Sequence, residues 1–389
     1  MADFGLGSDI LDLLDSLDFN NLVDTKKSTI ELSTEYPYIV FERADLVKVL
    51  NLCSKLIQAK STSPIYNSII LVPVEECKSL YFYATNALSH FRYRVELLGN
   101  SSEILDENIS ISITILQKIV RLMSDKVLLY KKDGYYFVRL VDGDLQIDVR
   151  SVESNLVFFP GETKDKLCDL ALSSFGTAVN STIPLLDVKT GSNKINFLGE
   201  YMLFYSPYFI INSVINTPRM SLSSKDAEFI SRLYKYYKDK SVSIFTVNTE
   251  LPRLLLKLDN IEYEFINSNA SISDYFSPTN ISSSITVNYD KFYNLVNLAT
   301  SLPNSQNIIR LYPKNNKLGF SMLVNNIYSD FVLDILEDVT PNVDIKVKAD
   351  LLKKLLTSVT DIENLKIYLF ELYIVIEYDN IKATLLTYN

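Results

Sequence analysis

The sequence has few of the residue types from which enzyme active sites are usually built. Its 389 residues include one histidine, three cysteines, ten glycines and no tryptophan. No GxxxxGK or GxGxxG loop is present to hold a phosphate group. His90 has neither a partnering cysteine nor a GxSxG serine, so a metal site or a nucleophilic site is not indicated. We therefore expect a protein that is not an enzyme and that uses no cofactor or metal.

The cysteines and the apolar residues also exclude several cellular contexts. Cys53, Cys77 and Cys168 lie far apart, show no CxxC spacing and are odd in number, which argues against a disulfide framework. No run of 18 apolar residues occurs, and the first residues carry aspartates where a signal peptide would carry positive charge. We expect a cytoplasmic protein.

One acidic pair has the spacing of a metal site. Asp142 and Asp144 form a DxD pattern around Gly143. Because strand-like segments flank this pattern, a tight hairpin turn is the better interpretation.

The most informative feature that is present is an internal repeat. Residues 39–56, IVFERADLVKVLNLCSKL, match residues 285–302, ITVNYDKFYNLVNLATSL, and both read as a short strand followed by an amphipathic helix. Residues 109–125 match residues 345–361 in the same way. A third, more diverged pair of segments lies between these copies, at residues 157–175 and 224–240. Three modules of roughly 120 residues each are therefore predicted.

Each module reads as a set of short strands with two helices. Runs rich in tyrosine, phenylalanine and β-branched residues predict strands between the paired helices. We interpret these aromatic residues as sheet packing, since they do not interleave with arginines as in a platform that stacks nucleic-acid bases. The fold class is α+β, with two helices per module packed on antiparallel sheets. The expected helices cover residues 44–60, 113–126, 163–175, 224–240, 288–302 and 346–360.

The net charge of −9 hides a strong asymmetry. The segments 44–60, 113–126, 224–240 and 346–360 together carry fifteen Lys or Arg against six Asp or Glu. These helices therefore contribute +9, and the rest of the chain contributes −18. An acidic protein that gathers its positive charge on a few helices is expected to bind a polyanion through them.

On each of these helices the basic residues lie opposite an apolar stripe at 3.6-residue spacing. We expect them to face outward and to contact phosphate groups of double-stranded DNA without reading base sequence. The alternative is an ordinary solvated face, because lysine is common on any amphipathic helix. The expected contact residues are Lys48, Lys55, Lys118, Arg121, Lys225, Arg232, Lys235, Lys238, Lys353 and Lys354.

The repeat layout resembles that of the bacterial-type DNA sliding clamp, the β-subunit processivity factor of replicative polymerases. The segments ADLVKVLNLCSKLI, PIYNSIILVPV and LYFYATNALS are similar to the clamp's opening helix, its next strand and its ATD-type strand end. Asn86 stands where that family usually has an aspartate, and FLGEYMLFYS at residues 197–206 stands where it has ATDGHRL. The chain ends in LLTYN in place of Met-Pro-Met-Arg. Such drift would fit a clamp from a bacteriophage.

The resemblance implies an acidic N-terminal tail at residues 1–29 and three clamp domains at residues 30–152, 153–280 and 281–389. Two chains would join head to tail into a homodimeric ring of six domains that encircles duplex DNA and tethers a replicative polymerase. The helices would line the hole, and the strands would form the rim. Because an encircled duplex cannot leave the ring, each contact with DNA can stay weak enough for sliding.

The resemblance also implies a pocket between the second and third domains for peptides of a DNA polymerase and a clamp loader. Residues 14–19, LDSLDF, partly resemble the hexameric peptide that enters this pocket in the family, although a plain acidic tail explains them as well. The matching pocket positions are Gly199, Tyr201, Met202, Leu203, Tyr275, Phe276, Pro278, Thr384, Leu385 and Leu386.

Two other functions would share part of this pattern. A clamp-fold transcription co-activator that tethers RNA polymerase to DNA would differ only in its partner. A viral structural protein of repeated β-rich domains would have no reason to gather lysine on four helices. Gel filtration separates this last class from a clamp, because a ring of three-domain chains predicts a dimer.

Overall fold

A computed structural model describes the chain between residues 36 and 387, with gaps. Within these residues the same order of ten elements occurs three times: strand, helix, four strands, helix and three strands. We refer to each occurrence as a unit. The described ranges are 36–57, 61–74, 78–98, 107–141, 143–159, 163–186, 194–268, 283–302, 305–324, 327–336, 344–359, 362–370 and 372–387.

The first unit consists of β1 (Tyr38–Glu42), α2 (Arg43–Cys53), β2 (Ser68–Val74), β3 (Ser79–Thr85), β4 (His90–Glu96), β5 (Asn108–Ser112), α4 (Ile113–Ile119), β6 (Lys126–Lys132), β7 (Tyr135–Leu140) and β8 (Gly143–Ile147). It also contains the short helix α3 (Pro64–Asn67) and the strand β9 (Val149–Val152), which pairs with β5. In the second unit the elements are β10 (Thr163–Ala171), α5 (Leu172–Asn180), β11 (Ile195–Phe197), β12 (Tyr201–Tyr205), β13 (Phe209–Val214), β14 (Met220–Leu222), α6 (Ser224–Tyr237), β15 (Ser241–Val247), β16 (Arg253–Leu258) and β17 (Ile261–Ile266). In the third unit they are β18 (Ser283–Asn288), α7 (Tyr289–Ser301), β19 (Ser305–Lys314), β20 (Lys317–Val324), β21 (Ile327–Leu333), β22 (Ile345–Lys348), α8 (Ala349–Thr357), β23 (Asn364–Leu369), β24 (Tyr373–Tyr378) and β25 (Ile381–Leu386).

Every unit contributes two four-stranded antiparallel sheets, and the units join through the edges of these sheets. In the first unit the strand orders are β1-β6-β7-β8 and β5-β2-β3-β4, and the equivalent orders recur in the other two units. β4 pairs with β17, so that a nine-stranded sheet runs from the first unit into the second. β13 pairs with β25, so that an eight-stranded sheet runs from the second unit into the third. We call these pairings the first joint and the second joint.

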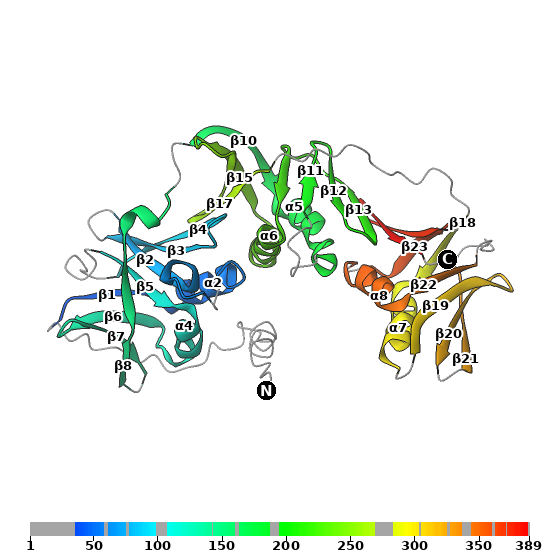
Figure 1. Ribbon diagram of the computed structural model, residues 1–389, viewed down its shortest axis with the longest axis horizontal. Coiled ribbons are helices and arrows are strands. Elements are labelled where there is room, and N and C mark those ends of the chain that lie inside the picture. The colour runs from blue at the N-terminus through cyan, green and yellow to red at the C-terminus, as the bar shows by residue number, and fades with distance from the viewer. Residues whose placement is uncertain are drawn as a thin grey trace.

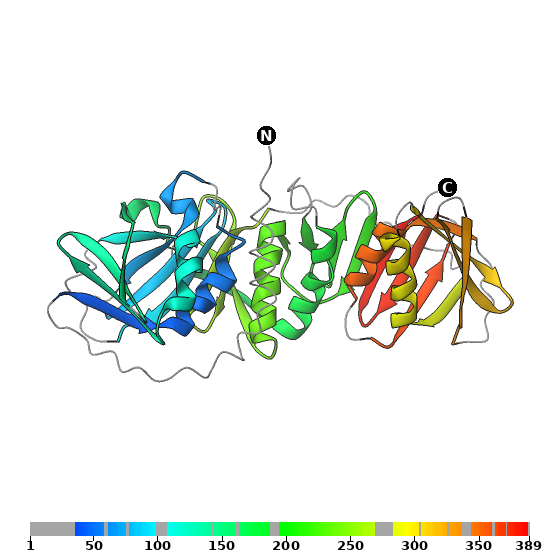
Figure 2. The same cartoon turned by 90° about the horizontal axis from the view of Figure 1, so that it is seen from below.

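The three units form an arch (Figure 1). Helices α2, α4, α5, α6, α7 and α8 lie on its concave side, and the sheets form its convex side. Figure 2, seen from below, shows the same helices turned toward the viewer. Helix α5 packs on α6 and α7 packs on α8, whereas α2 contacts α6 across the first joint. The arch therefore presents one continuous layer of helices on its inner side.

The six helices of this layer each begin where a strand ends, which fixes their direction relative to the sheet. Helix α6 starts with a capping box, in which the Ser223 side chain accepts from the Asp226 amide and the Asp226 carboxylate accepts from the Ser223 amide. In α7 the Asn288 side chain accepts from the Lys291 amide. Such caps pair amide groups that would otherwise be unsatisfied at the helix end.

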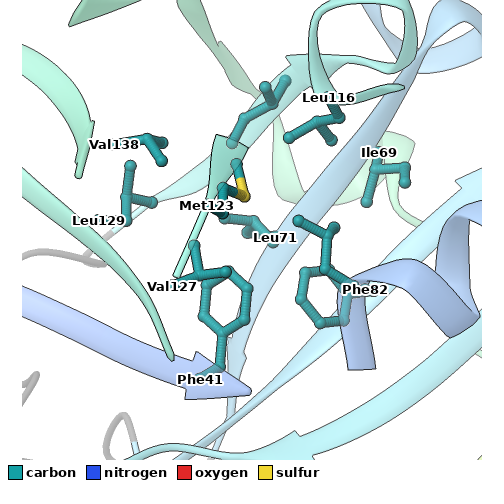
Figure 3. Close-up of a pocket in the computed structure, with 11 residues that line it drawn as sticks. Phe41, Ile69, Leu71, Phe82, Leu116, Met123, Val127, Leu129 and Val138 are labelled. Carbon is teal, nitrogen blue, oxygen red and sulfur yellow. The ribbon is translucent and has the colours of Figure 1, made fainter. Parts of the chain in front are cut away.

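Apolar residues from the helices and from both sheets of a unit share one core. Figure 3 shows this core in the first unit, where Phe41, Leu71, Phe82, Leu116 and Val138 converge. A cavity of about 10 Å³ remains between them, and its lining residues are all apolar. A space of this size and character holds at most one water molecule and offers no polar partner to it. The cavity therefore belongs to the packing of the core and not to a ligand site.

The predicted α+β class with antiparallel sheets is confirmed. One expected helix, residues 163–175, was wrong, because Thr163–Ala171 form strand β10 and the helix α5 starts only at Leu172. Most side chains of β10 are exposed, so its sequence lacks the apolar alternation that marks a half-buried strand. Pairing with β15 decides its conformation instead.

Helix α2 ends at Cys53, well before residue 60, and two further helix limits also differ from expectation. Lys126 begins β6, and Ile345–Lys348 form β22 ahead of α8. Asp133 and Gly134 both have positive φ and form the tight turn between β6 and β7.

Candidate nucleic-acid interface and the joints of the arch

Five of the ten basic residues expected on the helix faces are exposed. The apolar faces of the same helices are buried, so exposed side chains on them point away from the sheets. Because these helices form the concave side of the arch, that side carries positive charge. The exposed residues are Lys118 in α4, Arg121 directly after it, Lys235 in α6, Lys238 directly after it and Lys354 in α8.

Arg232, another of the ten, is half-buried at the first joint. Its guanidinium donates to the Ser54 hydroxyl at 2.7 Å and to the carbonyl oxygen of Asn51. These bonds connect α6 to the end of α2. Arg232 therefore stabilises the contact between two units.

Lys48 and Lys353 also have partners within the chain. The Lys48 ammonium donates to the Tyr93 hydroxyl at 3.2 Å and lies over the ring of the same residue. The Lys353 ammonium donates to the Thr300 hydroxyl at 3.4 Å and links α8 to α7. Both lysines are half-buried, so less of their charge faces solvent than that of the exposed residues.

Lys55 and Lys225 are half-buried near Glu228. Burial raises the pKa of the Glu228 carboxyl, and the positive charges of Lys55, Arg232 and Lys225 oppose that rise. This carboxylate thus lies among cations, and it offsets part of the charge of the half-buried lysines.

A buried ion network lies at the first joint. The Arg92 side chain is fully buried and donates to Glu262 at 3.1 Å, to Glu264 at 3.4 Å and to the carbonyl oxygen of Phe158 at 2.9 Å. Arg253 donates to the other oxygen of Glu264 at 3.3 Å. Burial raises the pKa of Glu264, and the two guanidinium groups oppose that rise. Strands β4 and β17 are therefore held together by charge as well as by the sheet.

His90, the single histidine, belongs to the same joint. Its Nδ1 lies 2.7 Å from the Tyr83 hydroxyl and 3.1 Å from the Thr85 hydroxyl, and its ring stacks on Phe158. Burial and the nearby Arg253 and Arg92 lower the pKa of His90 to about 3. The imidazole is therefore neutral at physiological pH, and its role is structural.

The second joint differs from the first in the residues that face each other across it. Ile211 stands opposite Ala383, and Asn212 stands opposite Lys382. The ion-pair partner of Lys382 is Glu377 on the neighbouring strand β24, at 3.7 Å. Backbone pairing and apolar contacts therefore contribute more to this joint than charge does.

The two ends of the arch expose the strands equivalent to those that form the joints. β8 occupies the position of β17 and β25 in its unit, and β21 occupies the position of β4 and β13. Each ends a four-stranded sheet, with no strand beyond it among the described residues. Tyr328 and Val332 on β21 are 73% and 47% exposed. Exposed edge strands with apolar side chains favour pairing with another strand.

An apolar surface patch lies where the neighbouring strands β12, β13, β25 and β24, in the middle of the eight-stranded sheet, begin or end. The Leu386 amide donates to the carbonyl oxygen of Tyr208 at 3.1 Å, and the Thr387 amide donates to that of Leu372 at 2.8 Å. We define the sheet-end patch as Tyr205, Tyr208, Leu372 and Leu386, whose side chains are 64%, 43%, 56% and 40% exposed. Neighbouring apolar side chains that remain exposed mark interaction surfaces.

Only part of the pocket expected from the sequence coincides with this patch. Met202, Leu203, Thr384 and Leu385 are buried in the sheet, so they offer no surface to a peptide. Gly199 and Tyr201 lie at the opposite end of β12 from Tyr205. Leu386 alone of the described pocket positions belongs to the patch. Tyr275, Phe276 and Pro278 lie outside the described residues.

The expected pocket positions of the second unit and the sheet-end patch lie at different ends of β12 because of how the second unit matches the first. The Asn86 amide donates to the carbonyl oxygen of Ser89, and the Ser206 amide donates to that of Phe209 in the same way. Residues 204–209 are therefore the equivalent of ATNALS, and FLGEYMLFYS overlaps them only at residues 204–206. Aligning Tyr81 with Tyr201 would have shown this from the sequence.

Within the described ranges, no helix is both long and apolar enough to cross a membrane. The same residues contain no cluster of three or more His, Cys, Asp or Glu side chains suited to a metal ion.

The fold is found among solved structures, although no protein-family model and no curated protein matches the sequence. The DNA polymerase III β subunit of Thermotoga maritima superposes with a TM-score of 0.76 at 11% identity, covering 90% of this chain and 99% of that one. The β subunit of Borrelia burgdorferi gives 0.76 at 10% identity, covering 92% and 100%. The DNA polymerase sliding clamp of Bacillus subtilis gives 0.71 at 12% identity, covering 91% and 99%. The chain therefore has the sliding-clamp fold.

Proposed function

We propose that this protein is a DNA sliding clamp. Two copies would close head to tail into a ring that encircles duplex DNA and holds a replicative polymerase on it. The observation that carries this proposal is that the free edges β8 and β21 are the equivalents of the strands that already join the units within one chain. A joint that occurs twice inside the arch can occur again between two arches.

The internal joints also specify how β8 and β21 would pair. Ile261 stands opposite Tyr93 in the first joint, and Ile381 stands opposite Ser213 in the second. Counting from the hairpins before these strands, Gly143 is the equivalent of Ile261 and Ile381. Phe331 is the equivalent of Tyr93 and Ser213, because each is reached through three successive strand pairings from the residue four positions before a helix. These starting residues are Ile345 before α8, Ile109 before α4 and Met220 before α6. Gly143 of one copy would therefore lie opposite Phe331 of the other, and Leu145 opposite Ser329.

Such a ring would hold six domains, three from each chain, with limits at residues 30–152, 153–280 and 281–389. Each of these ranges contains one repeated unit. The helix layers of both arches would line the hole, and their exposed lysines and arginines would contact phosphates without sequence preference. The large divergence from the solved bacterial clamps fits a bacteriophage origin and action in the cytoplasm of a host cell.

Covalent closure of the ring on DNA tests this proposal. Leu145→Cys and Ser329→Cys place one thiol on each free edge, in a background with Cys77→Ser and Cys168→Ser. The equivalent pair, Tyr263 and Phe91, lies three positions along from the hydrogen-bonded pair of Asn260 and Arg94. Because the two kinds of pair alternate and three is odd, it is a non-hydrogen-bonded pair. Its Cα atoms are about 4.5 Å apart, within reach of a disulfide.

Oxidation with nicked circular DNA is expected to give a protein–DNA complex that survives detergent and is released when the DNA is cut once. The control Leu145→Cys with Val332→Cys puts the second thiol on the opposite face of β21, so it should give no such complex. A cross-linked product that leaves circular and linear DNA equally would contradict encirclement.

We propose in addition that the sheet-end patch binds a short extended peptide of a DNA polymerase or a clamp loader. The patch is apolar, and it lies where two units meet. Extended peptides bind such surfaces by placing leucine and aromatic side chains on them. Residues 14–19, LDSLDF, have both kinds of side chain and supply a probe from the chain's own sequence.

A labelled peptide of residues 10–20 is expected to bind a chain that lacks residues 1–29. Combined Tyr208→Ser and Leu386→Ser should weaken it about tenfold, since each loses about 1 kcal/mol of apolar contact or less. Val214→Ser is the control, because Val214 is 72% exposed at the opposite end of the same sheet. Equal affinity for all three proteins, measured by fluorescence anisotropy, would remove the patch from the proposed function.

A further inference from the structure

We infer that, in the proposed ring, the joint between two copies is electrostatically the weakest, because Asp144 of one copy lies opposite Asp330 of the other. This inference rests on the proposed ring and on the strand register derived for β8 and β21. It concerns one strand position that carries a charged residue in all three units. The residue that faces this position across the joint is different at each joint.

The same position of the last hairpin holds an ion pair in every unit. Arg139 on β7 pairs with Asp144 on β8 at 2.9 Å. Lys257 on β16 pairs with Glu262 on β17 at 3.1 Å. In the third unit the signs are reversed, with Glu377 on β24 and Lys382 on β25 at 3.7 Å. Asp144, Glu262 and Lys382 are therefore the equivalent charged residues that face a joint.

The residue that faces this charged position across the joint differs between the first joint and the second. Glu262 faces Arg92, and the two form an ion pair at 3.1 Å. Lys382 faces Asn212, a neutral residue. The residue equivalent to Arg92 and Asn212 is Asp330 on β21. Asp144 would therefore meet a second carboxylate where Glu262 meets a guanidinium.

The cations that accompany these two aspartates lie on their own sides of the joint. Arg139 belongs to the strand behind Asp144, and Lys314 lies 3.7 Å from Asp330 within the third unit. The Asp144 and Asp330 side chains are 33% and 50% exposed in the single chain. Pairing of β8 with β21 would remove part of this water and bring the two carboxylates to a cross-strand separation of about 5 Å.

Like charges directly opposite each other destabilise an antiparallel pair. The first joint is thus stabilised by charge, the second is close to neutral, and the joint between copies is opposed by charge. A ring built in this way would open between copies and not within a chain.

Sedimentation velocity on the full chain tests this inference through the dimer dissociation constant. Asp330→Arg recreates at the copy-to-copy joint the pair that Arg92 and Glu262 form within the chain. The dissociation constant is expected to fall about 5- to 30-fold, because a repulsive pair becomes an attractive one. Asp334→Arg is the matched control, since it changes the same charge beyond the residues that would pair with β8.

The fall of the dimer dissociation constant in Asp330→Arg must also depend on Asp144. Asp144→Asn combined with Asp330→Arg is expected to lose most of the gain that Asp330→Arg gives alone. Raising the salt concentration should tighten the wild-type dimer by screening the two carboxylates and should loosen the Asp330→Arg dimer.

The outcomes separate this inference from the proposed ring. A wild-type dimer whose affinity changes equally in Asp330→Arg and Asp334→Arg would overturn the inference and leave the ring standing. A gain that persists in the Asp144→Asn background would overturn the register. No dimer in any of these proteins, with no disulfide between Leu145→Cys and Ser329→Cys, would remove both the ring and the inference.

Discussion

Arg92→Met is expected to lower the stability of the first joint by roughly 3–5 kcal/mol, the usual cost of leaving a buried charge without its partner. The Arg92 side chain is fully buried and supplies donors to Glu262, Glu264 and Phe158. Glu264 is itself inaccessible, and after the substitution it would keep only Arg253. Methionine fills much of the space, so the loss comes mainly from the uncompensated carboxylate.

Native-state hydrogen exchange of the amides in β4 and β17 measures this change locally. Protection should fall roughly 100- to 3000-fold in Arg92→Met. Adding Glu264→Gln removes the stranded charge, so the double variant should recover part of the protection. The control is Arg310→Met, which breaks an exposed pair with Asp344 and should cost about 1 kcal/mol or less. Unchanged protection in Arg92→Met would show that backbone pairing alone holds the joint.

Replacing the five exposed residues of the ten expected DNA contacts by glutamine is expected to weaken DNA binding about 1000-fold at 100 mM salt. Each phosphate contact that is lost should also reduce the slope of log affinity against log salt concentration by roughly 0.9. The substitutions are Lys118→Gln, Arg121→Gln, Lys235→Gln, Lys238→Gln and Lys354→Gln. Their side chains are exposed on helices whose other faces are buried, so the sheets should keep their packing.

A matched variant changes the net charge equally on the strands. Its five lysines are all exposed, and Figure 1 places their strands on the convex side or at the end of the arch. This variant should keep the wild-type salt slope in a titration with a short duplex. An equal loss of affinity in both variants would mean that net charge, and not the helix layer, attracts DNA. The substituted residues are Lys164, Lys166, Lys317, Lys366 and Lys382.

The repeat and the fold class could be predicted from the sequence because they depend on local patterns. The spacing of Leu46, Leu50 and Cys53 identifies the buried face of α2, and the same spacing recurs in the buried residues of α7, Phe292, Val296 and Ala299. These residues contact a sheet in every unit, so the repeat constrains them strongly. Strand β10 was not predictable in this way, because its conformation depends on β15, whose paired residues lie 70 or more positions away along the chain.

The candidate site was predictable only in part. Charge counting identified the basic helices, but it could not separate exposed Lys235 from Arg232, which differ by three positions and lie in different surroundings. The partners of Arg232 come from α2 in another unit. The free edges β8 and β21 have no sequence signal of their own, because an edge strand is defined by what does not pair with it.

The complementary edges of the unit have a consequence for how such a protein is encoded. Each unit carries one edge of the β8 type and one of the β4 type, and the strand pairing of both internal joints is made by these edges. Phe158, from the segment that connects the first two units, adds further contacts with Arg92 and His90 at the first joint. The connecting segments also raise the local concentration of one unit near the next. Six units could then form a ring whether each chain carries one, two or three of them. When three units are fused, the facing residues of each internal joint can change in sequence without affecting the other joint. The residues of the terminal edges β8 and β21 must remain able to pair with each other.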